Sequence, residues 1–304
     1  MRRCKRTGSA VGNPAAGPAA ASRLFRKNRR PIRECPILSY NEVYAMIKRL
    51  YTEVTQSRFI IKNLVNQALT VKYKRSILGF FWSVINPLAN MLILAAVFSN
   101  IMRLNIRDYV VFLYSAMLPW SFFAQAAEIG ASSIVTAEGF IKKIYVPKIV
   151  FPLSNVLTIF INVLFQFVAL FFILLFRQAT ISPALLFLPV SFAILFVLVT
   201  GVSLLTTTAC VYFRDIPYLI NVLMSAWYYL TPIIYPLDLI SENLQPVFLM
   251  NPMYYFIQLF RGPIYDHMIP SEQTLVITTV IAVVVLFVGL FVFYRRERDF
   301  VYRL

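Results

Sequence analysis

Residues 149–176 read IVFPLSNVLTIFINVLFQFVALFFILLF, and this stretch contains no Asp, Glu, Lys or Arg. A helix that crosses a bilayer needs about 20 consecutive, mainly apolar residues. This stretch is longer than that, and its polar side chains are all small hydroxyls or amides. It therefore predicts a transmembrane helix over 149–176.

Similar apolar stretches occur on both sides of this one. We expect further membrane helices at about 80–102, 109–134, 183–211, 216–235 and 273–294. The stretch 216–235 carries the weakest signal, because Pro217, Pro232 and Pro236 interrupt it. Residues 236–272 mix more prolines with aromatic side chains, which is typical of short re-entrant or interfacial helices.

The composition of the chain agrees with a membrane location. Of its 304 residues, 59% are hydrophobic and 14% are charged, and the mean hydropathy is +0.70. Soluble domains are about half apolar and about a quarter charged. A soluble fold of this length could not bury so much apolar surface. We predict an all-α polytopic membrane protein with about six transmembrane helices.

Basic residues are distributed unevenly along the chain, which has a net charge of +16. If the N-terminus is cytoplasmic, 25 of the 29 Lys and Arg residues fall in cytoplasmic segments. The remaining four are Arg103, Arg107, Arg177 and Arg261. Cytoplasmic loops of membrane proteins carry an excess of Lys and Arg. We therefore expect both termini in the cytoplasm, and basic charge that meets membrane lipid rather than nucleic acid.

Three segments flank or precede the apolar region. Residues 1–39 are basic and lack the apolar core of a secretory signal, so we expect a disordered tail; a transit peptide and an over-called start are the alternatives. Residues 40–79 place apolar side chains at helical spacing between Arg and Lys, which predicts an amphipathic interfacial helix. The membrane domain then covers 80–294, and residues 295–304 form a basic tail.

Motifs for catalysis or energy conversion are missing from the sequence. It has no Gly-rich phosphate loop, its one histidine is His267, and Cys4, Cys35 and Cys210 fit neither a disulfide framework nor a metal site. Glu128 is the one acidic residue within the predicted spans. Ion-coupled carriers usually need such carboxylates. We expect no cofactor, no metal and no enzymatic activity in this chain.

Polar side chains form stripes at helical spacing on three predicted spans. The stripes are Ser83, Asn86 and Asn90; Ser121, Gln125, Glu128 and Ser132; and Asn155, Thr158, Asn162 and Gln166. Small polar residues often hydrogen bond between membrane helices. The stripes therefore indicate either such packing or a hydrated path, for which Gln125, Glu128 and Asn162 are the candidates.

Aromatic residues are placed unusually deep in two spans. Trp120 and Trp227 each lie about 11 residues into a span, or about 16 Å at 1.5 Å per residue. Membrane-interface tryptophans lie shallower. Flat rings with polar groups can stack on sugars, so Trp120, Trp227, Tyr228 and Tyr229 are candidate path residues. The alternative is ordinary packing.

The predicted inner loop after the second span differs from a simple linker. Residues 138–148, EGFIKKIYVPK, combine apolar side chains with three lysines. A short helix that docks onto a partner has this composition, and a loop that contacts lipid is the alternative. Candidate docking residues are Lys142, Lys143, Tyr145, Lys148, Arg214 and Asp215.

Several of these motifs, taken in order, resemble one family of transport proteins. They are KYKRSILGFFWSVINPL at 72–88, LPWSFF at 118–123, IKKIYVPK at 141–148, RDI at 214–216 and NPM at 251–253. Together they are similar to ABC-2 type permeases that export lipid-linked polysaccharide, in the O-antigen and teichoic-acid branch. The resemblance covers about residues 40–304.

The resemblance implies an architecture and a set of partners. Two copies would form a homodimer with a channel between them, in a bacterial inner membrane. A separate cytoplasmic ATPase subunit would bind each copy through the 138–148 loop, and the helix before the first span would act as a gate. The substrate would be a lipid-linked glycan. The alternatives are an ABC-2 exporter of a small lipid or drug, and a membrane-embedded transferase acting on lipid-linked sugar.

Overall fold

The computed structural model describes residues 40–74, 79–102, 105–176 and 182–304. The chain divides into two compact units, residues 1–45 and 46–304. Of the first unit, only the beginning of helix α2 (Tyr40–Gln56) is described, so the predicted tail 1–39 lies outside the described residues. The helices long and apolar enough to cross a membrane all lie in the second unit.

The described residues are 85% helical and contain no strand, which confirms the all-α prediction. Its long helices are α3 (Arg58–Tyr73), α4 (Trp82–Met102), α5 (Ile106–Ala131), α8 (Val150–Phe176), α9 (Leu188–Tyr212), α10 (Ile216–Tyr229) and α13 (Glu272–Arg296). Short α-helices are α6 (Ser133–Thr136), α7 (Glu138–Ile141), α11 (Gln245–Leu249), α12 (Pro252–Arg261) and α14 (Phe300–Arg303). Single turns are η1 (Gly79–Phe81), η2 (Pro183–Phe187), η3 (Leu237–Leu239), the π-helical η4 (Gly262–Asp266) and η5 (Glu297–Asp299).

Five of the described helices are long and apolar enough to cross a membrane, namely α4, α5, α8, α9 and α13. The predicted count of six is not confirmed. The sixth candidate, 216–235, corresponds to α10, which has 14 residues. At 1.5 Å per residue, α10 is about 21 Å long, whereas the hydrocarbon layer is about 30 Å thick.

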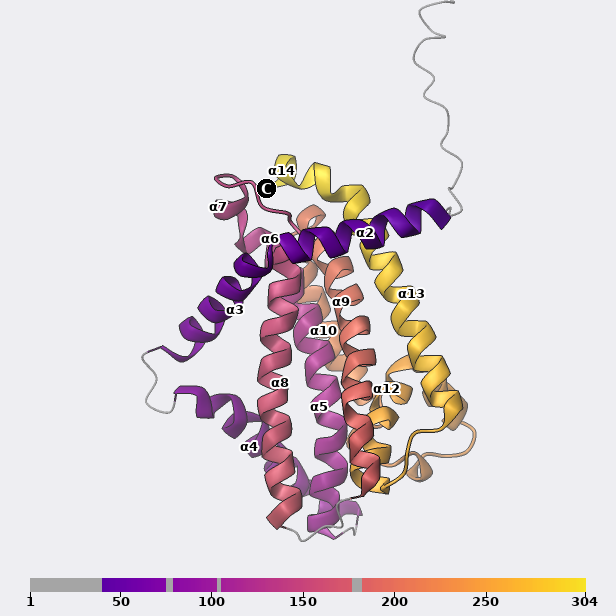
Figure 1. Ribbon diagram of the computed structural model, residues 1–304. Coiled ribbons are helices and arrows are strands. Elements are labelled where there is room, and N and C mark those ends of the chain that lie inside the picture. Colours follow the sequence, from indigo (N-terminus) through magenta and orange to yellow (C-terminus); the bar gives the residue numbers. More distant parts are fainter. Residues whose placement is uncertain (1–39, 75–78, 103–104, 177–181) are drawn as a thin grey trace, which may run out of the picture. The chain divides into compact units, whose positions relative to one another are not determined.

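Helix α5 lies at the centre of the membrane domain and packs against α4, α8, α9, α10 and α12 (Figure 1). Most of α5 is buried, while most of α4 and α13 is exposed. Helices α9 and α13 cross closely at Gly201 and Gly289, where no side chain separates the two backbones. Small residues at such crossings are the usual basis of helix packing in membranes.

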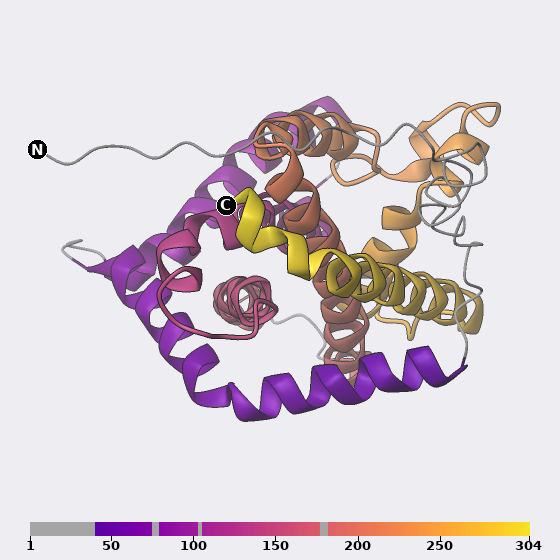
Figure 2. The ribbon, with the colours of Figure 1, turned by 90° about the horizontal axis from the view of Figure 1, so that it is seen from above.

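One end of this unit carries most of its charged side chains. It is formed by α2 from Met46 onward, the residues before α8, the end of α9 and the end of α13, and we call it the basic end. Arg49 of α2 and Lys148 both bond to Glu297 there, and Tyr212 of α9 donates to Asp299 over 2.9 Å. Seen from above, α2 and α3 run along the edges of the helix bundle (Figure 2).

The chain returns from the basic end to the opposite end between α9 and α13. Arg214, just after α9, lies beside Arg303, whereas the carbonyl of His267 accepts a hydrogen bond from Ser182 before α9. Helix α10 and residues 230–271 therefore make this passage together. Asn251 caps α12 by accepting from the amide of Met253 at 3.0 Å, and Pro252 follows at the first helical position.

Candidate functional site

The aromatic side chains predicted to line a path form one cluster between α5 and α10. The ring of Trp120 lies 6.2 Å from that of Trp227 and 5.8 Å from that of Tyr228, both nearly edge to face. Phe123 lies 5.4 Å from Trp227 at 90°. Edge-to-face pairs at these separations are favourable beyond their burial. Two tryptophans more than 100 positions apart in the sequence are thus direct neighbours.

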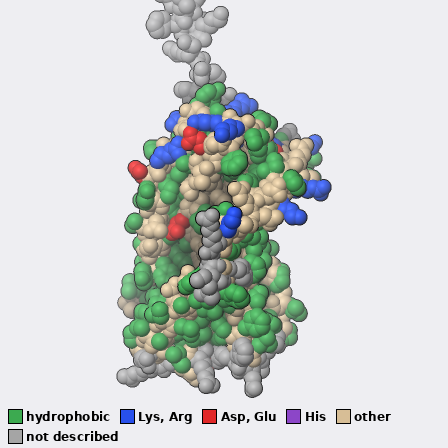
Figure 3. Space-filling view, turned by 90° about the vertical axis from the view of Figure 1, so that its left-hand side faces the viewer, with side chains coloured by type: hydrophobic (Ala, Val, Ile, Leu, Met, Phe, Trp, Pro, Cys, Tyr) green, Lys and Arg blue, Asp and Glu red, His purple; other side chains and the backbone are tan. Residues whose placement is uncertain are grey.

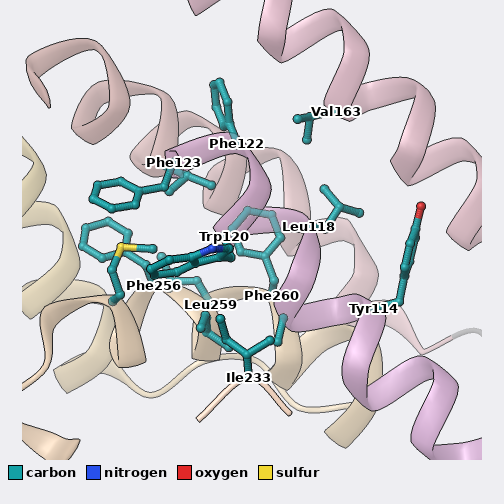
Figure 4. Close-up of a cluster of buried hydrophobic side chains, with 14 of the residues drawn as sticks. Tyr114, Leu118, Trp120, Phe122, Phe123, Val163, Ile233, Phe256, Leu259 and Phe260 are labelled. Atoms are coloured by element: carbon teal, nitrogen blue, oxygen red, sulfur yellow. The ribbon is translucent and has the colours of Figure 1, made fainter. Parts of the chain in front are cut away.

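Members of this cluster differ sharply in exposure. Trp120 is 6% exposed, and in Figure 4 it lies among Phe123, Leu259 and Ile233. Trp227 and Tyr228 are half-buried, and Tyr229 is 66% exposed. Within one copy, Trp120 therefore acts as packing, while Tyr229 is the member that a passing molecule could contact.

Asn251 fixes Trp227 and the chain just after α10 by hydrogen bonds. Its side-chain oxygen accepts from the indole nitrogen of Trp227 at 3.0 Å, and its amide donates to Thr231 Oγ1 at 2.8 Å and to the Leu230 carbonyl at 3.2 Å. The same residue caps α12. One side chain thus joins the end of α10 to the start of α12, which fixes the direction in which Trp227 points.

The polar stripes contact different neighbours. Glu128 accepts from the side-chain amide of Asn221 at 3.3 Å, across the contact between α5 and α10, and Gln125 is half-buried one turn away. Asn162 instead accepts a 2.6 Å hydrogen bond from the Tyr73 hydroxyl at the end of α3, and it is 3% exposed. The structure therefore joins Glu128 to α10, and it does not bring Asn162 to the same surface.

Most side chains of helix α10 are exposed, on a surface that lies beside Glu128. Only Ile220 and Met224 are buried on this helix. Its exposed side chains are Tyr218, Leu219, Asn221, Val222, Leu223, Ser225, Ala226 and Tyr229. Asn221 and Ser225 form a narrow polar strip within an otherwise apolar surface. We call this surface the α10 face.

At the basic end, the candidate docking residues divide into two groups. Lys142, Lys143 and Tyr145 are exposed, and Tyr145 has no contact that shields it from solvent. A 2.5 Å ion pair joins Lys142 to Glu138 one turn earlier. The pKa of Glu138 is lowered by this hydrogen bond and by the positive charges of Lys142 and Arg214. Asp215 is exposed beside it.

Lys148 differs from these exposed candidates because it is half-buried and bonded to a distant part of the chain. Its ammonium donates to the backbone carbonyl of Glu297 at 2.6 Å and lies 5.9 Å from the Phe300 ring. The carboxylate of Glu297 in turn bonds to Arg49 at 2.6 Å, and Arg49 also bonds to Glu53 at 2.6 Å. Tyr294 donates to Glu53 at 3.0 Å. We call Arg49, Glu53, Lys148, Tyr294 and Glu297 the basic-end network.

The described residues offer no group of three or more His, Cys, Asp or Glu side chains that could hold a metal ion. The geometry thus consists of an apolar bundle with one exposed, partly polar face and one exposed basic loop.

The ABC-2 type transporter family matches residues 61–265, from within α3 to η4. This chain belongs to that family.

Several proteins are similar to this ABC-2 chain along most of its length. The O-antigen export system permease protein RfbA of Myxococcus xanthus is 29% identical over 262 residues, which cover 83% of this chain and 98% of the relative. A protein of the same name from Klebsiella pneumoniae is 34% identical over 191 residues, or 62% and 74% of the two chains. The polysialic acid transport protein KpsM of Escherichia coli is 22% identical over 244 residues, or 78% and 93%.

Three features of this ABC-2 chain do not follow from reasoning on the sequence. Tyr73 was counted only as part of a basic motif, although it fastens α3 to Asn162. Asn251 was noted only as part of a motif, although Asn followed by Pro is a recognisable helix start. The basic-end network had no sequence signal, because its members lie up to 248 positions apart.

Proposed function

We propose that this chain is the membrane subunit of an ABC exporter that moves a lipid-linked polysaccharide, such as an O-antigen, out of the cytoplasm. The observation that carries this proposal is the similarity to a polysaccharide export permease over 98% of that relative's length. The proposed location is a bacterial inner membrane. The proposed organisation is an interfacial segment at 40–79, a membrane domain at 80–294 and a basic tail at 295–304.

The proposed orientation places the basic end in the cytoplasm. On the face shown in Figure 3, Lys and Arg gather over the upper half, and the lower half is mostly hydrophobic. At the opposite end, the described charged side chains include Asp108, Asp238, Asp266 and Glu272, and Arg261 there is buried. An excess of basic residues on one side supports a cytoplasmic location for that side. The side chains of Arg103, Arg107 and Arg177 lie outside the described residues.

A cytoplasmic ATPase subunit is the proposed source of energy, and the exposed loop at 142–145 is its proposed docking site. Moving a charged lipid head or a polar glycan through hydrocarbon is costly. The sequence has no phosphate-binding loop with which the chain itself could use ATP. The loop combines exposed Lys142 and Lys143 with the exposed apolar side chains of Ile144 and Tyr145, which suits a partner rather than bulk water.

A second copy of the chain is the proposed partner of the α10 face. On a helix that faces only lipid, the polar strip of Asn221 and Ser225 would be costly, and so would Glu128 next to it. Two such faces turned toward each other would enclose these polar groups, together with Tyr229, in a shared path. The glycan would then slide along Tyr229 and the half-buried Trp227 and Tyr228.

Reconstitution in liposomes tests the function. The purified chain alone should hydrolyse no ATP and transport no glycan, and addition of its ATPase subunit should produce both activities. A variant of that ATPase without its phosphate-loop lysine should produce neither. Transport by the chain alone under a proton or sodium gradient would contradict the proposal and direct attention to Glu128.

Charge reversal tests the docking loop separately. Lys142→Glu combined with Lys143→Glu should abolish ATP-driven transport while the protein remains in the membrane. The matched control is Lys48→Glu with Lys62→Glu, which changes the net charge equally on the exposed sides of α2 and α3. Equal transport by the two double variants would show that the loop does not dock the ATPase.

A further inference from the structure

A polar cavity of 430 Å³ lies at the end opposite the basic end. Its walls come from the start of α5, the residues around η3, helix α12 and the π-helical η4. Side chains that can hydrogen bond or stack line it, namely Asp108, Asp238, Asp266, Gln258, Tyr254 and Tyr265. Volumes of about 300–1,000 Å³ are typical of pockets for small molecules.

The inner wall of this cavity is held rigidly by Arg261. Its side chain is 4% exposed, and the guanidinium lies 3.8 Å from the centre of the Phe112 ring. It donates to the carbonyls of Pro232 at 3.1 Å and Ile233 at 3.2 Å, and its Nε has no hydrogen-bond partner. One buried cation thereby joins α5, the chain after α10 and α12, so the wall is formed before any ligand arrives.

Aromatic rings continue from this wall to the mouth of the cavity. The rings of Tyr265 and Phe112 lie 5.3 Å apart at 74° to each other, and Tyr265 is 37% exposed. Tyr254, on α12, is half-buried. An aromatic ring that packs against a neighbouring ring and is still partly exposed is suited to stack on the C–H face of a sugar.

The charges of the described lining narrow the choice of ligand. Among the described lining residues, Asp238 and Asp266 outnumber the one guanidinium of Arg261 even when Asp108, which has a partner of its own, is left out, so the lining is net negative and repels phosphates and other anions. The carboxylates are not gathered closely enough to form a metal site among the described residues. The lining is too polar for an acyl chain. Hydroxyl groups, by contrast, are good donors to carboxylate and amide oxygens.

We propose that this cavity binds one pyranose unit of a saccharide, through stacking on Tyr265 and hydrogen bonds to Asp238 and Gln258. If the proposed orientation and function hold, the cavity holds a sugar of the emerging glycan at the outer mouth. The binding itself requires neither ATP nor the partner subunit. It can therefore be tested on the chain alone, and it can fail while the transport proposal stands.

Saturation-transfer NMR on the purified full chain in lipid nanodiscs measures this binding directly. The probes are the methyl glycosides of glucose, galactose, N-acetylglucosamine, glucosamine and glucuronic acid. At least one neutral or amino sugar should receive saturation, and the anionic glucuronide should receive none. Saturation of the glucuronide equal to that of the neutral sugars would overturn the charge argument. No saturation of any probe would overturn the site.

Matched variants locate the bound sugar. Asp238→Asn should weaken binding about tenfold, as expected for the loss of one charged hydrogen bond, while Glu242→Gln, in the same segment but outside the cavity, should not. Tyr265→Ala should abolish stacking, and Tyr265→Phe should retain it. Unchanged affinity in Asp238→Asn and Tyr265→Ala would place the sugar elsewhere. Asp238 is exposed, so its variant is informative even if Tyr265→Ala fails to fold.

Discussion

The crossing of α9 and α13 should tolerate no side chain at Gly201 or Gly289. A Cβ atom on Gly201 would lie 2.6 Å from the backbone nitrogen of Leu286 and 2.7 Å from its Cα. A Cβ on Gly289 would lie 2.5 Å from the carbonyl oxygen of Gly201. Carbon atoms prefer separations of about 3.5–4.0 Å, so the helices would have to move apart by about 1 Å.

The expected change in the free energy of unfolding follows from two opposing effects. Overpacking a tight contact costs about 1–3 kcal/mol. Alanine gains at most about 1 kcal/mol over glycine as a helix former. The control Gly139→Ala lies in α7, where an added Cβ meets nothing within 4 Å, so it gains propensity without a clash. Gly201→Ala should thus be about 1–3 kcal/mol less stable than Gly139→Ala.

Equilibrium unfolding in mixed micelles, titrated with SDS, measures this difference. The double variant Gly201→Ala with Gly289→Ala should lose less than the sum of the single losses, because one separation of the helices relieves both clashes. Equal stability of Gly201→Ala and Gly139→Ala would refute the close crossing. Strict additivity would refute the shared separation.

Three further predictions concern the exposed surfaces. Cysteine at Val222 on the α10 face should form a disulfide between two copies under mild oxidation, in a background without the native cysteines; cysteine at Val280 on α13, which is also exposed, should not. In the assembled complex, cysteine at Tyr229 should react with a water-soluble thiol reagent at least tenfold faster than cysteine at Trp120, because only Tyr229 is exposed in one copy. Arg49→Gln should lower ATP-driven transport while costing less than about 1 kcal/mol in SDS unfolding, because its ion pairs are partly exposed.

The membrane helices were predictable because each depends on its own composition. The stretches 149–176 and 183–211 agree with α8 and with η2 followed by α9 to within one or two residues. The end of α10 was not predictable in the same way. It depends on Asn251, which bonds to Leu230 and Thr231 from about 20 positions away. A hydropathy profile does not show such a contact between distant residues.

The candidate site was predictable only in part. Helical spacing shows which residues share a face, but not which helix that face meets. The sequence therefore indicates Trp120 and Trp227 as two unrelated aromatic residues deep in their spans, although their rings pack together. Asn162 was assigned to a path by its stripe, although its partner is Tyr73. Arg261 was counted as a basic residue of an outer segment, yet it is buried on Phe112.

Helices α2 and α3 are each fastened to another part of the chain by a hydrogen bond, which limits how a gate formed by them could move. Ser57 separates the two helices, Arg49 joins α2 to Glu297, and Tyr73 joins the end of α3 to Asn162. Lys148, three residues after the proposed docking loop, donates to the backbone carbonyl of the same Glu297. A movement of the loop on ATPase docking would therefore reach α2 through two hydrogen bonds that share one residue. Asn162 is 3% exposed, so opening at that end would cost its side-chain oxygen the hydrogen bond from Tyr73 unless water or substrate replaced that donor. Opening of α3 would thus favour a hydroxyl-rich substrate over an apolar one.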